Sequence, residues 1–235
     1  MGERILSDMA KGLLHLIYPD LCAGCGTDLV GTKELICLEC LESLPLTNFH
    51  LHQNNPVEKI FAGRLSVRAA SAYVYFTKQS AMQHILHQIK YKNNKELGYY
   101  FGRKMGSALR QSAFYDDVSA LVPLPLYFKR EKRRGYNQAK LICDGMAEVM
   151  SIPVLDQVVQ RKSASETQTS KNRKERWENI NGKFQLTGAE AIAEKYILLV
   201  DDVVTTGATL EACGIELLKA PHLDLGIVTL AYTSS

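Results

Sequence analysis

One stretch near the C-terminus constrains the fold more than any other, because it joins an apolar run, an acidic pair and a small polar loop. Five apolar residues, Tyr196–Val200, are followed by Asp201 and Asp202, and then by the sequence Val-Val-Thr-Thr-Gly-Ala-Thr. A continuous apolar run of this length is typical of a strand buried on both faces, as in a parallel sheet covered by helices. The polar residues after it predict a loop that leads into a helix. This stretch alone therefore favours an α/β fold.

Apolar patterns of strand and helix length alternate through the rest of the chain after about residue 65. We predict strands at Ala69–Phe76, Ala120–Leu126, Val154–Val159, Tyr196–Val200 and Leu225–Tyr232, with helices over 82–89, 97–109, 139–150 and 210–218 and a polar, basic loop over 160–182. Strands that alternate with helices imply a parallel sheet flanked by helices on both sides. Ligands bind such sheets at the carboxyl ends of the strands, which is where the acidic pair lies.

The loop after the acidic pair has the features of a phosphate site. Backbone N–H groups ahead of a helix N-terminus bind anions, and the helix dipole favours negative charge there. Gly207 lets the backbone approach a ligand closely, and the neighbouring threonine hydroxyls can donate to phosphate oxygens. Thr205 or Thr206 can also cap the helix. The candidate phosphate-binding residues are Thr205, Thr206, Gly207, Ala208 and Thr209.

Two carboxylates beside a phosphate site fit a sugar phosphate. Asp201 and Asp202 can accept hydrogen bonds from the adjacent hydroxyls of a ribose, and carboxylate oxygens are ligands that Mg²⁺ takes in proteins. We therefore take both as the candidate catalytic residues of a site for ribose, phosphate and Mg²⁺. An ordinary strand-to-helix turn with capping residues is the alternative interpretation.

Four of the six cysteines form two tight pairs near the N-terminus, Cys22 with Cys25 and Cys37 with Cys40. Each pair can place two thiolates on one metal ion, and two pairs complete a tetrahedral four-cysteine zinc shell. All four positions are then taken by protein, so we expect the zinc to be structural. Disulfides or a redox-active pair are the alternatives, and they are disfavoured because no secretory signal is evident.

The remaining composition is that of an ordinary globular protein. The 235 residues are 46% hydrophobic and 23% charged, with a formal net charge of +3. No apolar run approaches the roughly 18 residues of a membrane-spanning helix, so we expect a cytoplasmic protein without membrane insertion. Residues 1–20 predict an amphipathic helix that packs on the protein itself, with membrane binding as the alternative. Residues 46 to about 65 predict a polar connection, marked by Asn55 and Pro56, and we place the domain boundary there. We expect a helix and zinc module over residues 1–55 and an α/β domain over residues 56–235.

Two basic segments flank the predicted site. Lys129, Arg130, Lys132, Arg133, Arg134 and Lys140 follow a proline-flanked strand, and Arg161, Lys162, Lys171, Arg173, Lys174 and Arg176 fill the predicted loop, with Gln168 and Trp177 interleaved. Basic groups on loops can bind pyrophosphate or a nucleic-acid backbone, and Tyr136 or Trp177 can stack on bases. The candidate contacts are Arg134, Tyr136, Asn137, Gln138, Arg161, Gln168 and Arg176. A solvated charged face is the alternative.

These motifs together resemble the ComF family, the phosphoribosyltransferase-like proteins associated with natural competence and DNA uptake. The resemblance is carried by the four-cysteine module, Val122-Pro123-Leu124-Pro125, Arg134-Gly135-Tyr136-Asn137-Gln138-Ala139, the spaced residues Arg161, Gln168, Arg176, Asn179 and Phe184, and the acidic string, which resembles the phosphoribosyl pyrophosphate (PRPP) signature of type I phosphoribosyltransferases. The loop departs from the family pattern, with Ser165-Glu166-Thr167-Gln168 and Lys171 in place of Thr-Pro-Pro-Gln followed by Leu.

The resemblance implies a type I phosphoribosyltransferase fold that binds PRPP or a ribose 5-phosphate nucleotide with Mg²⁺. It also implies a link to single-stranded DNA and to proteins of the competence machinery, and a loop over 160–182 that closes over the ligand. Two functions follow. An enzyme would let a nitrogen nucleophile attack C1 of PRPP through a cationic transition state that carboxylates stabilise. A binding module would hold single-stranded DNA or a nucleotide on the basic segments without turnover.

Overall fold

The computed structural model describes residues 19–29, 34–162 and 183–233. The amphipathic helix expected before Pro19 lies outside the described residues, as do Gln168, Arg176 and the rest of the predicted loop from 163 to 182. Within the described ranges, no helix is long and apolar enough to cross a membrane.

Four parallel strands form the central sheet, in the order β1-β6-β5-β2. The strands are β1 (Ala69–Tyr75), β2 (Ala120–Pro123), β5 (Tyr196–Val204) and β6 (Asp224–Tyr232). Leu198 of β5 lies opposite Gly226 of β6, and Val122 of β2 lies opposite Leu199. The first five residues of β5 are all buried, as a strand covered on both faces requires. The predicted parallel sheet is confirmed.

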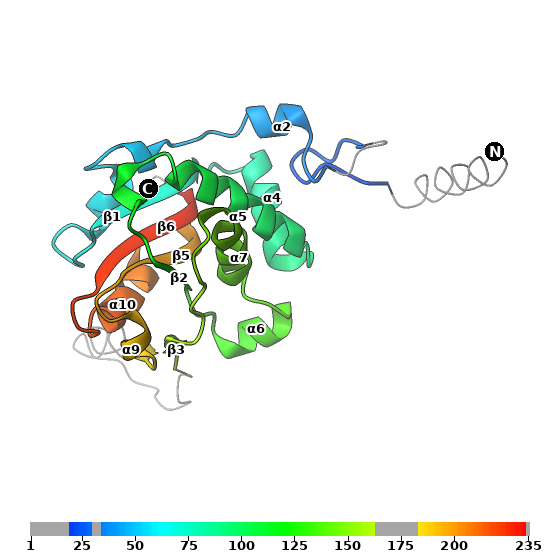
Figure 1. Ribbon diagram of the computed structural model, residues 1–235. Helices are drawn as coiled ribbons and strands as arrows, with labels where there is room; N and C mark the ends of the chain where they lie inside the picture. The colour runs from blue at the N-terminus through cyan, green and yellow to red at the C-terminus, as the bar shows by residue number, and fades with distance from the viewer. Residues whose placement is uncertain (1–18, 30–33, 163–182, 234–235) are drawn as a thin grey trace, which may run out of the picture.

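Helices cover both faces of this sheet (Figure 1). One face carries α4 (Ala81–Tyr91), α5 (Lys95–Leu109) and α7 (Gln138–Met150), and the other carries α3 (Pro56–Phe61), α9 (Ala189–Ile192) and α10 (Ala208–Leu217). Alternate residues of β5 serve the two layers, because Leu198 packs in the first core and Ile197 in the second. Cys143 and Cys213 are buried in α7 and α10, as expected of structural thiols.

Helices α5 and α7 approach closely because glycines line their contact. A Cβ atom added to Gly102 would overlap the carbonyl oxygen of Ile142, and one added to Gly145 would overlap the carbonyl oxygen of Tyr99. The backbones therefore touch directly, which leaves no room for a side chain at either position. Helix α7 also packs against β2 and β5.

The polar connection that we predicted over residues 46–65 is not a simple linker. It contains a 3₁₀ turn, η1 (Phe49–Leu51), and the helix α3. Asn55 caps this helix, since its side-chain oxygen accepts from the backbone N–H groups of Val57 and Glu58, and Pro56 occupies the first turn. The Asn-Pro pair that indicated a linker is therefore a helix start.

Three other element boundaries differ from the sequence prediction. The strand expected at Val154–Val159 is reduced to a bridge between Val154 and Leu121, while β3 (Val159–Arg161) pairs antiparallel with β4 (Phe184–Leu186). The strand expected to reach Leu126 ends at Pro123. The basic run expected to be a loop is instead a short helix, α6 (Phe128–Arg134), which ends at Gly135 in a left-handed conformation.

Candidate functional site

The acidic pair lies within strand β5 and not in the loop after it. The strand continues to Val204, so both aspartates are held by the sheet. The backbone N–H of Asp202 donates to Asp201 Oδ1 at 2.8 Å, and Asp202 is only 5% exposed. A carboxylate this deeply buried needs a cation or hydrogen-bond donors to balance its charge.

Lys90, the basic residue in the last turn of α4, supplies that cation. Its Nζ lies 2.9 Å from Asp202 Oδ2. No hydrogen bond of acceptable geometry reaches this oxygen in the part of the chain that the structure describes. Lys90 was not among the site residues predicted from the sequence. The available signal was its position directly after Ile89, the last buried residue of the apolar face of α4.

Asp201 lies in an environment that disfavours its negative charge. Burial raises the pKa of the Asp201 carboxyl well above its usual range, and the neighbouring Asp202 carboxylate raises it further. The backbone N–H of Asp202 and the charges of Lys90 and Arg161 act in the opposite direction but do not outweigh these effects. The two carboxyl groups of the pair are therefore not equivalent, although they are adjacent in the sequence.

The predicted phosphate loop lines an open hollow directly after the acidic pair. Its lining combines one aspartate, the loop and the start of α10: Asp201, Val203, Val204, Thr205, Thr206, Gly207, Ala208, Thr209 and Leu210. The expectation that Thr205 or Thr206 caps the helix is wrong, because Gly207 is the N-cap and no side chain makes a capping hydrogen bond. The backbone N–H groups of the first turn of α10 therefore stay available at the hollow.

Gly207 is required by both its conformation and its surroundings. Its φ angle is 72°, in the left-handed region that favours glycine. A Cβ atom there would also lie 2.5 Å from Ile60 Cγ2 and 2.9 Å from Phe61 Cε1 of α3. The loop is thus shaped by packing against α3, a helix that lies far away in the sequence.

Arg64 fixes the same loop from outside. Its Nη1 donates to the carbonyl oxygen of Thr206 at 3.2 Å, and its Nη2 forms an ion pair with Glu211 in the first turn of α10. Sequence reasoning missed this residue, because it lies in the segment that we predicted to be a linker. Arg64 places a positive charge beside the loop without entering the hollow lining.

The basic residues predicted to touch a ligand have varied surroundings. Arg134 Nη1 donates to Gln138 Oε1 at 2.7 Å, its guanidinium lies 5.2 Å from the centre of the Tyr91 ring, and its buried Nε has no hydrogen-bond partner among the described residues. Arg161 lies in β3, with its guanidinium 5.5 Å from the centre of the Phe184 ring. It is near enough to Asp201 to oppose the rise in the pKa of that carboxyl.

Tyr136 and Asn137 mainly connect structural elements. Tyr136 is 8% exposed, and its hydroxyl donates to the carbonyl oxygen of Ile89 at the end of α4. Asn137 caps α7, since its side-chain oxygen accepts from the N–H of Ala139 at 2.9 Å, while its Nδ2 donates to the carbonyl oxygen of Leu124 at 3.0 Å. This motif therefore connects α4, the end of β2 and the start of α7.

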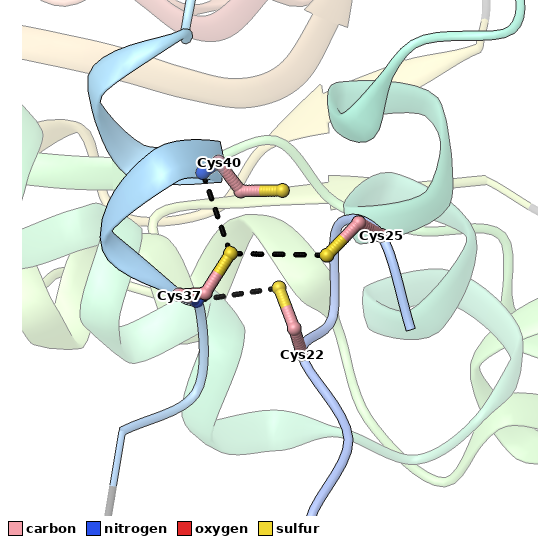
Figure 2. A group of neighbouring side chains, drawn as sticks. All are labelled: Cys22, Cys25, Cys37 and Cys40. Carbon is pink, nitrogen blue, oxygen red and sulfur yellow. Dashed lines mark hydrogen bonds between the residues drawn. The ribbon is translucent and has the colours of Figure 1, made fainter. Parts of the chain in front are cut away.

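The four paired cysteines form a cluster beside α4. Figure 2 shows their sulfur atoms close together, with Cys37 and Cys40 at the start of α2 (Leu38–Glu42). All four sulfurs lie within 4.8 Å of one another, and Cys25 Sγ is 3.7 Å from Cys37 Sγ. A tetrahedral zinc site with bonds of about 2.3 Å would place its sulfurs about 3.8 Å apart. The cluster could therefore bind zinc.

The backbone around Cys22 favours its thiolate form. Burial opposes ionisation of Cys22, but the backbone N–H groups of Cys25, Cys37 and Gly24 outweigh it and lower its pKa to about 6. Thiolate is the form that binds zinc. The cluster is also docked on α4, because His84 Nδ1 lies 2.8 Å from the carbonyl oxygen of Gly24 and Gln88 Nε2 donates to that of Ala23.

Fold and site together define an α/β protein in which strand β5 carries an acidic pair and is followed by a glycine-containing loop, with a four-cysteine cluster near the N-terminus. The chain is similar to proteins that are named for competence and DNA utilization. It is 32% identical over 130 residues to "Competence protein F" of Haemophilus influenzae, covering 54% of this chain and 57% of that protein. It is 25% identical over 191 residues to "DNA utilization protein YhgH" of Escherichia coli, covering 80% of each chain. Over 152 residues it is 28% identical to "Competence protein ComFC" of Bacillus subtilis, covering 63% of this chain and 60% of that one.

These homologues confirm the resemblance to the ComF family, although the first match spans little more than half of the Haemophilus protein. No family model matches the chain. Solved structures similar to it include a glutamine PRPP amidotransferase from Bacillus subtilis, with TM-score 0.44 and 13% identity over 61% of this chain and 30% of that one. They also include an adenine phosphoribosyl transferase from Trypanosoma brucei, with TM-score 0.38 and 13% identity over 77% of this chain and 82% of that one.

Proposed function

We propose that the chain binds a phosphorylated ribose, either PRPP or a ribose 5-phosphate nucleotide, at the carboxyl end of β5. One observation carries this proposal: the hollow formed by residues 203–210 opens directly beside Asp201. A phosphate can accept from the N–H groups at the start of α10 while the ribose hydroxyls donate to the aspartates. A site for phosphate alone would gain nothing from two adjacent carboxyl groups.

Mg²⁺ fits the same site through the carboxyl group of Asp201, which lines the hollow, while Asp202 lies next to it, paired with Lys90. When bound, it would neutralise charge on a pyrophosphate group. The protein's own residues would do the rest: the loop would hold the phosphate, Asp201 and Asp202 would orient the ribose, and Arg134 or Arg161 would contact pyrophosphate. As an enzyme, the protein would use the carboxylates to stabilise positive charge that develops at C1 during transfer to a nitrogen acceptor.

Isothermal titration with PRPP tests this proposal when the zinc-loaded protein is compared with the double variant Asp201→Asn plus Asp202→Asn. We expect the double variant to lose PRPP binding, because both hydrogen-bond acceptors lose their charge. Asp116→Asn, which changes an exposed aspartate near the amino end of β2, should bind like the unchanged protein. Unchanged PRPP affinity in the double variant would rule out the acidic pair as the ribose site.

A non-enzymatic single-stranded DNA or nucleotide module is the second candidate, and α6 is the observation that favours it. This helix exposes Lys129, Arg130, Lys132 and Arg133, and Tyr91 nearby is 57% exposed beneath Arg134. Cations beside an exposed aromatic ring suit a single strand. Binding to a labelled oligonucleotide should then weaken with salt, with a logarithmic slope of roughly −0.7 per phosphate contacted. A salt-independent affinity would contradict a backbone contact.

The cellular role that we propose is natural competence and DNA uptake, with the protein acting in the cytoplasm beside proteins of the competence machinery. The names of the homologues support this role. We further propose a structural zinc ion at the four cysteines and a division into a zinc module over 1–55 and a phosphoribosyltransferase-type domain over 56–235. Limited proteolysis tests the division: a first cut between residues 46 and 56 would support it, whereas resistance of this segment would show that η1 and the start of α3 join the two parts into one unit.

A further inference from the structure

The end of α4 is held in place by contacts on both sides of Lys90. The apolar face of this helix, Met82, Ile85, Leu86 and Ile89, is buried in the core. The residue before Lys90 accepts a hydrogen bond through its carbonyl oxygen from the hydroxyl of Tyr136. The residue after it, Tyr91, lies with its ring under the guanidinium of Arg134. Both neighbours of Lys90 are therefore fixed by the Arg134-Gly135-Tyr136 segment.

This arrangement directs Lys90 at one particular oxygen. Its side chain is 24% exposed, while that of Asp202 is 7% exposed, and the two charges meet at 2.9 Å. Asp202 Oδ2 has no hydrogen-bond donor in the described ranges, so the ammonium group supplies its local charge balance. Leaving a carboxylate this buried without a cation is costly, which makes the position of Lys90 important for the state of the site.

We infer that Lys90 is a positioning residue that balances the charge of Asp202, and thereby makes the site select an anionic sugar phosphate over free Mg²⁺. This inference rests on the proposed function, because it assigns the ligand preference of the same site. The Arg134-Gly135-Tyr136 segment then acts at the site by holding the end of α4. It need not touch the ligand to be essential.

The loss of the Lys90 charge should change the affinities for a phosphorylated ligand and for Mg²⁺ in opposite directions. Removing the charge of Lys90 leaves the site with one more uncompensated negative charge. A phosphorylated ligand is repelled by that charge, whereas a bare divalent cation is attracted by it. Damage to the fold would instead weaken the binding of both.

The experiment titrates the zinc-loaded full chain with PRPP at fixed Mg²⁺ and, separately, with Mg²⁺ alone. For Lys90→Met we expect PRPP binding to weaken at least about tenfold and Mg²⁺ binding to strengthen severalfold, because charges at this separation interact strongly at the effective dielectric of a protein surface. Lys90→Arg should keep both affinities closer to those of the unchanged protein. Lys92→Met, which changes an exposed lysine two residues further on, is the matched control and should alter neither.

Two results would overturn the inference. One is a Lys90→Met protein that binds both ligands as well as the unchanged protein does. The other is a protein that loses affinity for both while Lys90→Arg loses it equally, since that pattern marks structural damage. Absence of PRPP binding to the unchanged protein would refute the proposed function instead, and the Mg²⁺ titration would still measure whether Lys90 competes with a cation at Asp202.

Discussion

The four-cysteine cluster and the acidic site differ in how the chain assembles them. All four sulfurs of the cluster come from residues 22–40, and backbone N–H groups of the same segment point at Cys22. The acidic site draws on β5 for Asp202, on α4 for Lys90 and on α3 for the packing that shapes the loop at Gly207. A local site can be inferred from spacing, whereas a distributed one requires the fold.

Helix α4 contacts both regions. His84 and Gln88, one turn apart on α4, contact carbonyl groups beside the cluster, and at the end of the helix Lys90 contacts Asp202. The cysteine segment therefore contacts the same helix, α4, that carries Lys90. This connection lets a change at one site be compared with its effect at the other.

Removing the metal from the cluster should have the largest effect. Zinc binding to a small site contributes on the order of 10 kcal/mol to folding the segment that holds it. We expect a strong chelator, or the change Cys22→Ser, to release about one zinc ion per chain and to lower Tm substantially, as measured by metal analysis and thermal unfolding. Restoring zinc should reverse the chelator effect but not that of Cys22→Ser. A metal-free protein with an unchanged Tm would contradict a structural zinc site.

Gly207→Ala should come next, because the loop before α10 depends on tertiary packing as well as on backbone conformation. The new Cβ would meet Ile60 and Phe61, at a cost of about 1–3 kcal/mol for overpacking in addition to about 1–2 kcal/mol for the left-handed conformation. Gly63→Ala is the matched control, since Gly63 has φ +71° and no atom near its added Cβ. Equal losses of unfolding free energy in denaturant would show that packing against α3 does not shape the loop.

The Lys90–Asp202 pair should show a smaller but specific coupling. Because Lys90 is partly exposed, solvent screening reduces its contribution, and we expect Lys90→Met to cost about 1–2 kcal/mol of unfolding free energy. Asp202→Asn in the Lys90→Met background should recover part of that loss, because the unpaired buried charge is gone. A double-mutant cycle with no coupling would mean that the two side chains do not interact in solution.

The smallest expected effect is the pH dependence that comes from Asp201. Its pKa is raised in the folded protein, so its favourable contribution is full below the unfolded pKa of about 4 and is lost as the pH rises through the folded value. Asp201→Asn mimics the protonated form. It should therefore gain about 1 kcal/mol or more over the unchanged protein at pH 8, and the gain should shrink toward pH 4. A gain that does not vary with pH would contradict the raised pKa, and Asp116→Asn controls for simple loss of charge.

The sequence was sufficient for the sheet and for the cysteine cluster because both depend on short-range patterns. The apolar run before Asp201 predicted a doubly covered strand, and the spacing of the cysteines predicted their convergence. It was insufficient for Lys90 and Arg64, because their partners, Asp202 and Thr206, lie more than 100 residues away and no neighbouring residue indicates them. Only the packing of the helices against the sheet places these residues at the site.

The same reasoning explains the errors. Taken alone, Asn55 and Pro56 indicate a turn. They begin a helix here because Val57 and Phe61 of that helix are buried in the core. Thr205 and Thr206 are good capping residues, yet the chain enters α10 through the left-handed Gly207 because α3 occupies the space beside it. In both places tertiary packing decided between two locally acceptable structures.

The central claim is that the carboxyl end of β5 binds a phosphorylated ribose with Mg²⁺, and one titration tests it most directly. Isothermal titration of the zinc-loaded chain with PRPP, with and without Mg²⁺, should give saturable binding that Mg²⁺ strengthens. No heat of binding at millimolar PRPP in either condition would contradict the claim and would favour the single-stranded DNA module on α6.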